Sequence, residues 1–201
     1  SDDHLQTWTR LLNTADITDI EFHPVNDSIV YAYDNYYNSN YGNQIMRSEN
    51  QGLSYTASSA ISGNGGSRGY IAVSPVAPDY VYFSSSNGVW KSSNKGLNFT
   101  FISNPIESCY GFAVSDIDTS DMLYGYLNLM GSTDGGQNFV ETAAWANTNP
   151  TDDYTHADLR TAECVNGVFY VGTDGYLSKT EDNGSTWSRL NDGTSIREFY
   201  A

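Results

Sequence analysis

A short pattern that recurs along the whole chain constrains its fold more than any other feature. The pattern is Ser or Thr, any residue, Asp or Asn, any residue, Gly, two further residues and an aromatic. Four full copies begin at Ser48, Ser92, Ser132 and Thr180, and a degenerate copy with Leu5 in place of glycine opens the chain. The closing aromatics follow one another at intervals of 40 to 48 residues. They are Trp8, Tyr55, Phe99, Phe139 and Trp187. A period of this length indicates a repeat architecture.

The residue types of the pattern predict a tight turn between two strands. Asp or Asn at the third position can accept backbone N–H groups two residues on, and the Ser or Thr hydroxyl can do the same nearby. Glycine at the fifth position permits a positive φ. The aromatic residue then begins the next strand and packs inward. We therefore predict a structural role for Ser48, Asn50, Gly52, Tyr55, Ser92, Asn94, Gly96, Phe99, Ser132, Asp134, Gly136, Phe139, Thr180, Asp182, Gly184 and Trp187.

Each interval between two turns holds three short strand-like runs, and a fourth run follows the turn. Residues 69–75, 79–83 and 88–92 are an example. The composition agrees, since 14% of the residues are aromatic and 16 are Tyr, which suits half-buried strands. Four antiparallel strands in about 45 residues make a propeller blade. We predict an all-β propeller of four-stranded antiparallel blades, with the repeated turn between strands C and D, counted outward from the axis. About four blades are visible, as part of a larger propeller.

The repeat also predicts the boundaries along the chain. We expect one propeller segment over residues 1–201, with little or no helix. Within it, residues 1–17 would form the outer strand of a preceding blade and residues 194–201 would begin the next one. The four blades would comprise residues 18–61, 66–106, 107–146 and 154–193. Such an arc leaves two sheet faces uncovered, so the isolated chain is expected to self-associate.

Three phrases of the sequence carry a resemblance to a known family. They are FHPVNDSIVYA, VSPVAPDYVYFSSSNGVWKSSNKGLNF and NGVFYVGTDGYLSKTEDNGSTWSRLNDGTSIREFY. These phrases resemble Asp-box, or BNR-type, propellers, which include sortilin-like luminal domains, xyloglucanase-like glycoside hydrolases, the photosystem II assembly factor and many secreted bacterial surface proteins. The last phrase looks most like repeats of large secreted proteins of Bacteroidetes-type bacteria. The resemblance implies the propeller fold and a secreted, extracellular or cell-surface location, and it specifies no activity.

The irregular segments point to one face of the propeller as a binding face. Because strands alternate in direction, the B–C and D–A loops open on the face opposite to the repeated turns. Residues 34–43, 62–68 and 144–158 lengthen three of these loops. Loops that vary on one face commonly meet partners. The candidate ligand-binding residues there are Tyr36, Tyr37, Tyr41, Arg68, Trp145, Asp152, Tyr154, His156 and Asp158. Their rings and polar groups suit a protein or glycan ligand, or other domains of the same long chain.

Metal binding is an alternative for part of the same segment. Asp152, Asp153, His156 and Asp158 have ligand chemistry, and His156 and Asp158 would share one side of an extended strand. We favour the simpler interpretation that the last two contact neighbouring loops and lock the fourth blade to the third. We therefore expect neither a metal nor a cofactor. Cys109 and Cys164 could form one disulfide, but the sequence does not show that their Cα atoms come within bridging distance, and we favour two free or buried thiols. Neither cysteine lies in a nucleophile motif.

Enzymatic activity is the second hypothesis for the function of this chain. A sialidase needs three arginines around a carboxylate, and Arg10, Arg47 and Arg189 all lie beside turns at the blade edge. A glycosidase needs two carboxylates across a cleft. The candidates, Asp152, Asp153 and Asp158, all lie on one segment. We thus expect a non-catalytic binding or scaffold module, with a fragment of a xyloglucanase-like glycoside hydrolase as the alternative.

Charge and hydropathy exclude two partner classes. The chain has 24 acidic and 9 basic residues, for a net charge of −15. Such a surface repels nucleic-acid phosphates, which require Lys and Arg for neutralisation. No run of the sequence is long and apolar enough for membrane insertion. We expect no nucleic-acid partner and no membrane insertion.

Overall fold

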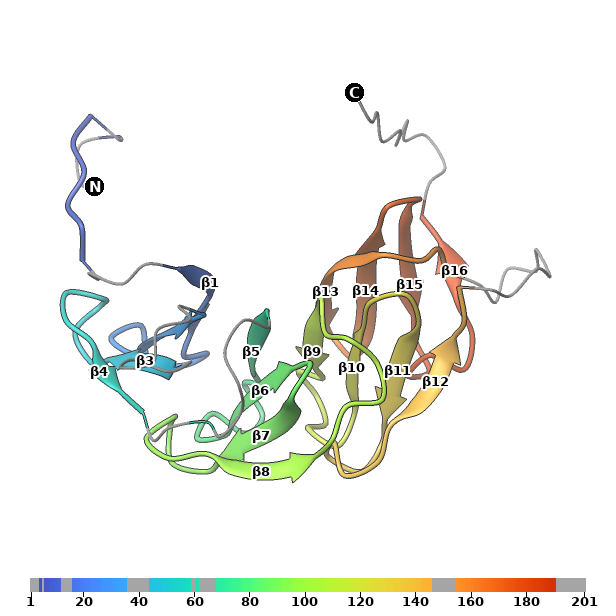
Figure 1. Cartoon of the computed structure of the whole chain (residues 1–201), viewed down its shortest axis with the longest axis horizontal. Helices are drawn as coiled ribbons and strands as arrows, with labels where there is room; N and C mark the ends of the chain where they lie inside the picture. Colours follow the sequence, from blue (N-terminus) through green and yellow to red (C-terminus); the bar gives the residue numbers. More distant parts are fainter. Residues whose placement is uncertain are drawn as a thin grey trace.

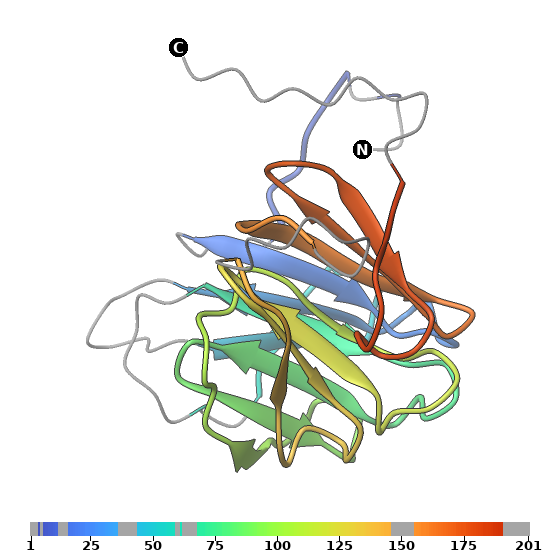
Figure 2. The ribbon, with the colours of Figure 1, turned by 90° about the vertical axis from the view of Figure 1, so that its right-hand side faces the viewer.

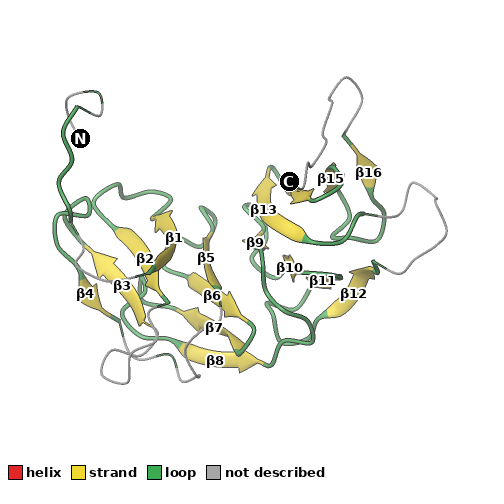
Figure 3. Ribbon diagram, turned by 45° about the horizontal axis from the view of Figure 1, so that its top comes forward, coloured by secondary structure: helices red, strands yellow, loops and turns green. Residues whose placement is uncertain are grey.

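The structure is a computed structural model, and it describes residues 4, 6–11, 16–35, 44–58, 61, 68–145 and 155–190. The described residues contain sixteen strands and no helix (Figure 3). The strands form four separate antiparallel sheets, and each sheet uses four strands that are consecutive in the sequence. The prediction of four-stranded blades in an all-β propeller is confirmed.

We number the blades in chain order. Blade 1 consists of β1 (Ile17–Phe22), β2 (Val30–Asp34), β3 (Gln44–Ser48) and β4 (Thr56–Ala57). Blade 2 consists of β5 (Gly69–Val73), β6 (Val81–Ser85), β7 (Gly88–Ser92) and β8 (Thr100–Ser103). Blade 3 consists of β9 (Phe112–Val114), β10 (Met122–Gly125), β11 (Leu129–Ser132) and β12 (Val140–Ala143). Blade 4 consists of β13 (Leu159–Val165), β14 (Val168–Thr173), β15 (Leu177–Thr180) and β16 (Ser188–Arg189).

The blades are arranged as an arc around a common axis. The first strands of the four blades, β1, β5, β9 and β13, lie on the inner side of the arc, and the last strands lie on its outer edge (Figure 1). A side view shows the strands of each blade next to one another in a twisted sheet (Figure 2). The inner strands are therefore strands A and the outer strands are strands D of the predicted blades.

The four repeated turns have one and the same hydrogen-bond pattern. In the turn after β15, the Thr180 hydroxyl accepts the N–H groups of Asp182 at 3.3 Å and Gly184 at 2.8 Å. Asp182 Oδ1 accepts the Thr186 N–H at 2.8 Å, and the glycine has φ +89°. The turns after β3, β7 and β11 repeat these bonds. The Asx side chain thus reaches four residues forward rather than the predicted two, because the hydroxyl already occupies the nearer amides.

Adjacent blades pack face to face, and their side chains fill three cores. Tyr33 and Phe83, from blades 1 and 2, have ring centroids 4.6 Å apart. The second core joins blades 2 and 3 around Tyr82 and Tyr124, and the third joins blades 3 and 4 around Leu123. Alternation along each strand sends successive side chains to opposite faces, so every blade except the first and last contributes to two cores.

Hydrogen bonds between loops define the two faces of the arc. In each of blades 1, 2 and 3, the C–D turn donates one backbone hydrogen bond to the A–B loop of the same blade, at 2.9 to 3.0 Å. The three bonds run from Gln51 N to Ser28 O, from Lys95 N to Asp79 O and from Gly135 N to Ser120 O. The B–C and D–A loops meet on the opposite face, where Tyr110 N donates to Gly125 O at 2.8 Å. The predicted division into a turn face and a B–C/D–A face follows from these contacts.

The chain ends differ from the rest of the pattern or lie outside the described residues. Residues 6–11, predicted as part of an outer strand, contain no strand. Trp8 is 76% exposed, whereas Trp187 is buried and packs in the core between blades 3 and 4. Residues 194–201, predicted to begin another blade, lie outside the described residues.

Candidate functional site

The B–C/D–A face carries a row of stacked side chains that crosses from blade 2 to blade 4. The Tyr110 and Tyr126 rings stack with centroids 4.2 Å apart and an interplanar angle of 23°. The Arg68 guanidinium lies 4.9 Å from the centre of the Tyr110 ring. At the other end, the negative charge of Asp158 raises the pKa of the Tyr126 phenol. We call Arg68, Tyr110, Tyr126 and Asp158 the loop-face row.

Backbone hydrogen bonds within blade 3 and between blades 3 and 4 hold the two tyrosines of the loop-face row in place. Tyr110 lies just before β9 and is tied to the end of β10 by its N–H. Tyr126 lies just after β10, and its carbonyl accepts the N–H of Leu159, the first residue of β13, at 2.9 Å. Each ring is therefore positioned by strands of the rigid sheets rather than by a long loop.

His156 and Asp158 do not share one side of a strand, which corrects that expectation. The structure assigns no strand at residues 155–158, and Asp158 has φ +62°. This turn sends Asp158 toward Tyr126 of blade 3, while His156 packs edge-to-face on Tyr176 with centroids 6.0 Å apart. The contact of Asp158 with blade 3 agrees with the interpretation that this segment locks blade 4 to blade 3.

The other sequence-derived candidates divide into exposed and undescribed residues. Trp145 is 54% exposed at the end of blade 3, and its N–H donates to Asn128 Oδ1 at 3.0 Å. It therefore lies on the same face as the loop-face row. Tyr36, Tyr37, Tyr41, Asp152, Asp153 and Tyr154 lie outside the described residues.

Sequence reasoning missed several residues of this face. Tyr110 and Tyr126 lie in short loops, whereas only the long loops were considered. The bidentate pair of Arg160 with Asp174, at 2.5 and 2.9 Å, and the stacking of Arg189 on Tyr176 were missed as well. The repeat register could have found the two tyrosines, because it places both of them at the ends of strands on this face.

A second site lies on the axis, between the inner strands. Two adjoining pockets of about 110 and 310 Å³ are lined by residues of β1, β5, β9 and β13. Both pockets contain Glu21 of blade 1 and Glu163 of blade 4, and the smaller one also contains Asp19 and Tyr70. Residues that are 142 positions apart in the sequence thus line one channel. We call this cavity the axial channel.

The axial channel is acidic, and its carboxyl groups hold protons unusually well. Burial raises the pKa of Asp19 to about 6, although the Ile71 N–H donates to its Oδ2 at 2.5 Å. Burial and the neighbouring Asp19 charge raise the pKa of Glu21 to about 7. Glu163 adds to the repulsion on both groups. Removing these side chains from water disfavours their charged forms, so part of this cluster is neutral near pH 6.

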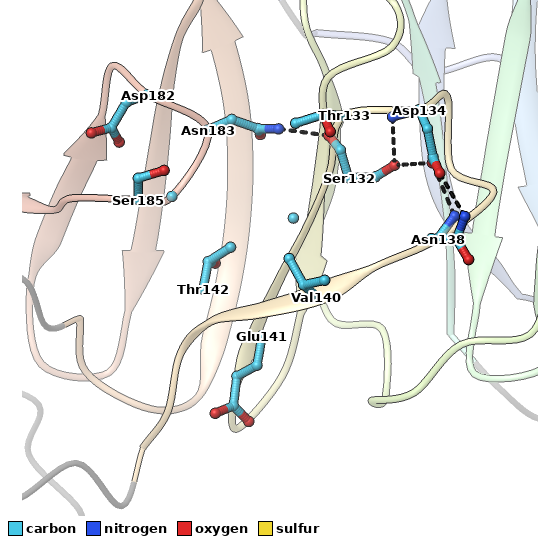
Figure 4. A pocket seen from close by; sticks show the side chains of 12 residues that line it. Ser132, Thr133, Asp134, Asn138, Val140, Glu141, Thr142, Asp182, Asn183 and Ser185 are labelled. Carbon is cyan, nitrogen blue, oxygen red and sulfur yellow. Dashed lines mark hydrogen bonds between the residues drawn. The ribbon is translucent and has the colours of Figure 1, made fainter.

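A groove of about 410 Å³ lies at the outer edge between blades 3 and 4 (Figure 4). Most of its polar side chains form hydrogen bonds in the repeated turns. Asp134 bonds Ser132 and Asn138, and Asn183 Nδ2 donates to the Ser132 carbonyl at 2.6 Å (Figure 4). The Asn183 bond joins the two blades and the other bonds lie within one turn, so we interpret the groove as a packing feature rather than as a ligand site.

One of the two cysteines, Cys164, lines the larger pocket of the axial channel. Cys109 is a buried free thiol whose pKa is raised to about 12 by burial, and Cys164 is also free. Within the described ranges, no group of three or more His, Cys, Asp or Glu side chains is arranged to hold a metal ion. The same part of the chain contains no helix that could span a membrane.

Comparison with known proteins places the chain among propellers. No family model and no curated protein sequence matches it. Among solved structures it is similar to a GH74 enzyme from Niastella koreensis, with a TM-score of 0.60 and 21% identity over 87% of this chain. It is similar to a GH74 xyloglucanase from Xanthomonas campestris, with a TM-score of 0.62 and 17% identity over 90% of this chain. It also resembles YCF48 bound to a D1 peptide, with a TM-score of 0.63 and 11% identity over 92% of this chain.

The chain corresponds to only part of each of these three solved structures. The chain spans 24% of the Niastella enzyme, 31% of the Xanthomonas enzyme and 58% of the YCF48 chain. At these identities the likeness extends to the propeller fold. GH74 enzymes and a protein bound to a D1 peptide share that fold, so the chemistry of this chain must be argued from its own residues.

Proposed function

We propose that this chain is a non-catalytic binding module of the Asp-box propeller type, which recognises a protein or glycan ligand through its B–C/D–A face. The four identical turn patterns support the Asp-box assignment. The loop-face row carries the binding proposal, because it gathers Arg68, two tyrosines and Asp158 from three blades on a rigid framework. We further propose a secreted or cell-surface location, in keeping with that family.

The residue types favour a protein over a glycan. Arg, Tyr and Trp are the side chains enriched at the energetic centres of protein interfaces. A glycan stacks on an open ring face, whereas the Tyr110 ring already contacts both Arg68 and Tyr126. Trp145 offers additional exposed aromatic surface on the same face.

The test is a binding screen with matched variants. The wild-type chain is titrated against a panel of immobilised peptides and a panel of neutral oligosaccharides. We expect peptide binding, a loss of at least tenfold in affinity for Arg68→Ala and for Trp145→Ala, and unchanged melting temperatures. Leu97→Ala, a control at an exposed position in a repeated turn on the opposite face, should bind like wild type. Binding that survives both loop-face variants would contradict the proposal, and oligosaccharide binding lost in both would assign the face to glycans.

A glycoside hydrolase fragment is the second candidate, and the axial channel is the observation that favours it. A general acid needs a carboxyl group that is still protonated near neutral pH, and Glu21, with its pKa of about 7, meets that condition. The distinguishing experiment is hydrolysis of xyloglucan and related glucans. Activity abolished by Glu21→Gln and retained in Arg68→Ala would favour this candidate over the binding module.

A further inference from the structure

Three A–B loops present an aliphatic side chain to solvent at the same structural position. One backbone hydrogen bond closes the turn in each of these loops, from an N–H to the carbonyl oxygen three residues earlier, at 2.8 to 3.0 Å. The residue just before this turn is Val25 in blade 1, Val76 in blade 2 and Ile117 in blade 3, and these side chains are 66%, 54% and 63% exposed. Single exposed apolar side chains are ordinary, but three at one position form a pattern. We call Val25, Val76 and Ile117 the loop-tip residues.

Neighbouring blades leave the loop-tip residues exposed even where a blade is present on each side. Blades 2 and 3 both pack between two other blades, and Val76 and Ile117 are nevertheless more than half exposed. Ile117 also lies against the A–B hairpin of blade 4, because a Cβ atom on Gly167 would be 2.4 Å from Ile117 Cδ1. The exposed aliphatic surface therefore belongs to the turn face and does not depend on the flanks of blades 1 and 4.

The A–B loops of blades 2, 3 and 4 contact one another around the axis. The Ser74 hydroxyl of blade 2 donates to Ser115 O of blade 3 at 2.8 Å. Asp116 of blade 3 accepts the N–H groups of Asn166 and Gly167, in the A–B hairpin of blade 4, at 2.7 and 2.8 Å. These bonds join the three loops into one rim, so the loop-tip residues of blades 2 and 3 are held in fixed relative positions.

This rim borders the axial channel on the turn face. Pro75 and Asp116 line the larger of the two pockets of the channel, of about 310 Å³, together with Glu163 of β13. Val76 and Ile117 directly follow Pro75 and Asp116 in the sequence. Two exposed aliphatic side chains therefore lie beside a cavity whose wall carries carboxyl groups. We call Pro75, Val76, Asp116 and Ile117 the channel mouth.

The surface around the channel mouth is acidic. The A–B loops and C–D turns of blades 2 and 3 contain five aspartates, and they comprise residues 74–80, 93–98, 115–121 and 133–138. Lys95 is the one basic residue in these segments, and its Nζ lies 3.4 Å from Asp79 Oδ1. The hydroxyl and the N–H of Ser120 hold the pKa of Asp118 below its usual value, so this exposed carboxylate is charged at neutral pH. The rim therefore has a net negative charge.

We propose that the channel mouth binds a basic segment of a protein partner, whose apolar side chains pack on Val76 and Ile117 while a lysine or arginine side chain pairs with Asp116 and Asp118. The occupant follows from charge complementarity, because an acidic surface attracts a cationic segment and repels an acidic one. A neutral glycan offers no positive charge and a simple cation offers no apolar surface, whereas a basic protein segment offers both. The channel mouth lies on the face opposite to the loop-face row, so this partner is independent of the ligand proposed there.

The two carboxylates of the proposed contact can accept further hydrogen bonds. Asp116 Oδ2 accepts the N–H of Asn166, and a carboxylate oxygen has a second lone pair for another donor. The N–H and the hydroxyl of Ser120 both donate to Asp118 Oδ1, which leaves Oδ2 for a ligand. A guanidinium or ammonium group of the partner supplies several donors at once and can bond both side chains.

Fluorescence anisotropy with a labelled peptide tests this contact. The probe is a short peptide in which lysines alternate with leucines, and two matched peptides carry glutamate in place of lysine or serine in place of leucine. The wild-type chain should bind the probe at least tenfold more tightly than either matched peptide. Added NaCl should weaken the binding, because salt screens exposed charges.

Variants of the chain locate the binding surface. The double variant Val76→Ser, Ile117→Ser should bind the probe at least tenfold more weakly than wild type, and Asp118→Asn at least threefold more weakly. All three positions are exposed or more than half exposed, so the melting temperatures should stay unchanged. Val140→Ser is the matched control, because it makes the same substitution at a valine that is 64% exposed on the outer strand β12. It should bind the probe like wild type.

The remaining outcomes decide against the channel mouth. Equal binding of the lysine and glutamate peptides would show that charge does not select the partner, and equal binding of the leucine and serine peptides would exclude the aliphatic contact. Probe binding that is unchanged in the double variant, or that Trp145→Ala abolishes, would place the peptide elsewhere and overturn the proposal. A wild-type chain that does not bind the probe at millimolar concentration would overturn it too.

Discussion

The hydroxyl and the carboxylate of a repeated turn differ in how much they contribute to the stability of the fold. The Thr180 hydroxyl accepts the Gly184 N–H, which is buried, whereas Asp182 accepts the Thr186 N–H, which is exposed. A buried N–H that loses its acceptor cannot form a hydrogen bond with water instead. The loss of its hydrogen bond therefore lowers the free energy of unfolding more than the loss of an exposed hydrogen bond does. The backbone N–H of Asn138 and that of Thr186 lower the pKa of Asp134 and Asp182, respectively, so both are charged at neutral pH.

We therefore predict that Thr180→Val destabilises the chain more than Asp182→Ala. The first change leaves the buried Gly184 N–H without an acceptor and should lower the free energy of unfolding by about 1–3 kcal/mol. The second should lower it by about 0.5–1.5 kcal/mol. Urea denaturation measures both, with Asp27→Ala, an exposed aspartate in the loop before β2, as the control. Equal effects of the two turn variants would contradict this ranking.

At the level of strands, the repeat predicted most of the fold. The period and the turn residues are local signals, so they located the four turns and the strands beside them, including β7 with its Gly88–Ser92 run. The predicted hydrogen-bond partner of the Asx side chain was wrong by two residues. The neighbouring hydroxyl accepts the nearer amides, and the sequence pattern does not show which of the two groups is closer to them. Trp8, which closes the degenerate copy of the turn, is 76% exposed, so the pattern alone did not predict the burial of every closing aromatic.

The candidate site was less predictable than the strands. Arg68, Trp145 and Asp158 were identified because they lie in irregular loops. The stacking of Tyr110 on Tyr126 depends on how adjacent blades are placed, and no local pattern contains that information. The axial channel was missed for the same reason, because Glu21 and Glu163 approach only when the arc curves.

The acidic inner strands predict a pH dependence of stability. The pKa of Glu21 is raised from 4.5 to about 7 in the folded chain, so folding favours its neutral form. Its stabilising effect is complete below the unfolded pKa near 4.5 and is lost as the pH rises through 7. Asp19, with its pKa raised to about 6, acts in the same direction. Stability should therefore fall between pH 5 and about pH 8.

The variant Glu21→Gln tests this assignment, because glutamine keeps the shape and removes the charge. At pH 8 it should raise the free energy of unfolding by roughly 1–2 kcal/mol, since water at the open side of the arc screens part of the repulsion. At pH 5 it should have little effect. Thermal unfolding across this range measures the slope, and Glu141→Gln on exposed β12 is the control. A wild-type slope preserved in Glu21→Gln would exclude this residue as the cause.

For the whole molecule, the stacking of blades predicts an order of local stability. Blades 2 and 3 are covered on both faces, whereas blades 1 and 4 each have one uncovered face. Amide hydrogen exchange should therefore be slowest in β6 and β10, and fastest in the two-residue strands β4 and β16. Exchange that is slowest in blade 1 or blade 4 would contradict this order.

The use of consecutive strands in every sheet has a consequence for synthesis of the chain. Sheets usually form slowly, because distant segments must meet before any contact stabilises them. Here each blade pairs only segments within one repeat of 40 to 48 residues, and no described blade waits for a strand made earlier or later. A blade can thus fold soon after it leaves the ribosome and offer one face for the next blade to pack on. The propeller would then grow in one direction, from the N-terminus, while translation continues.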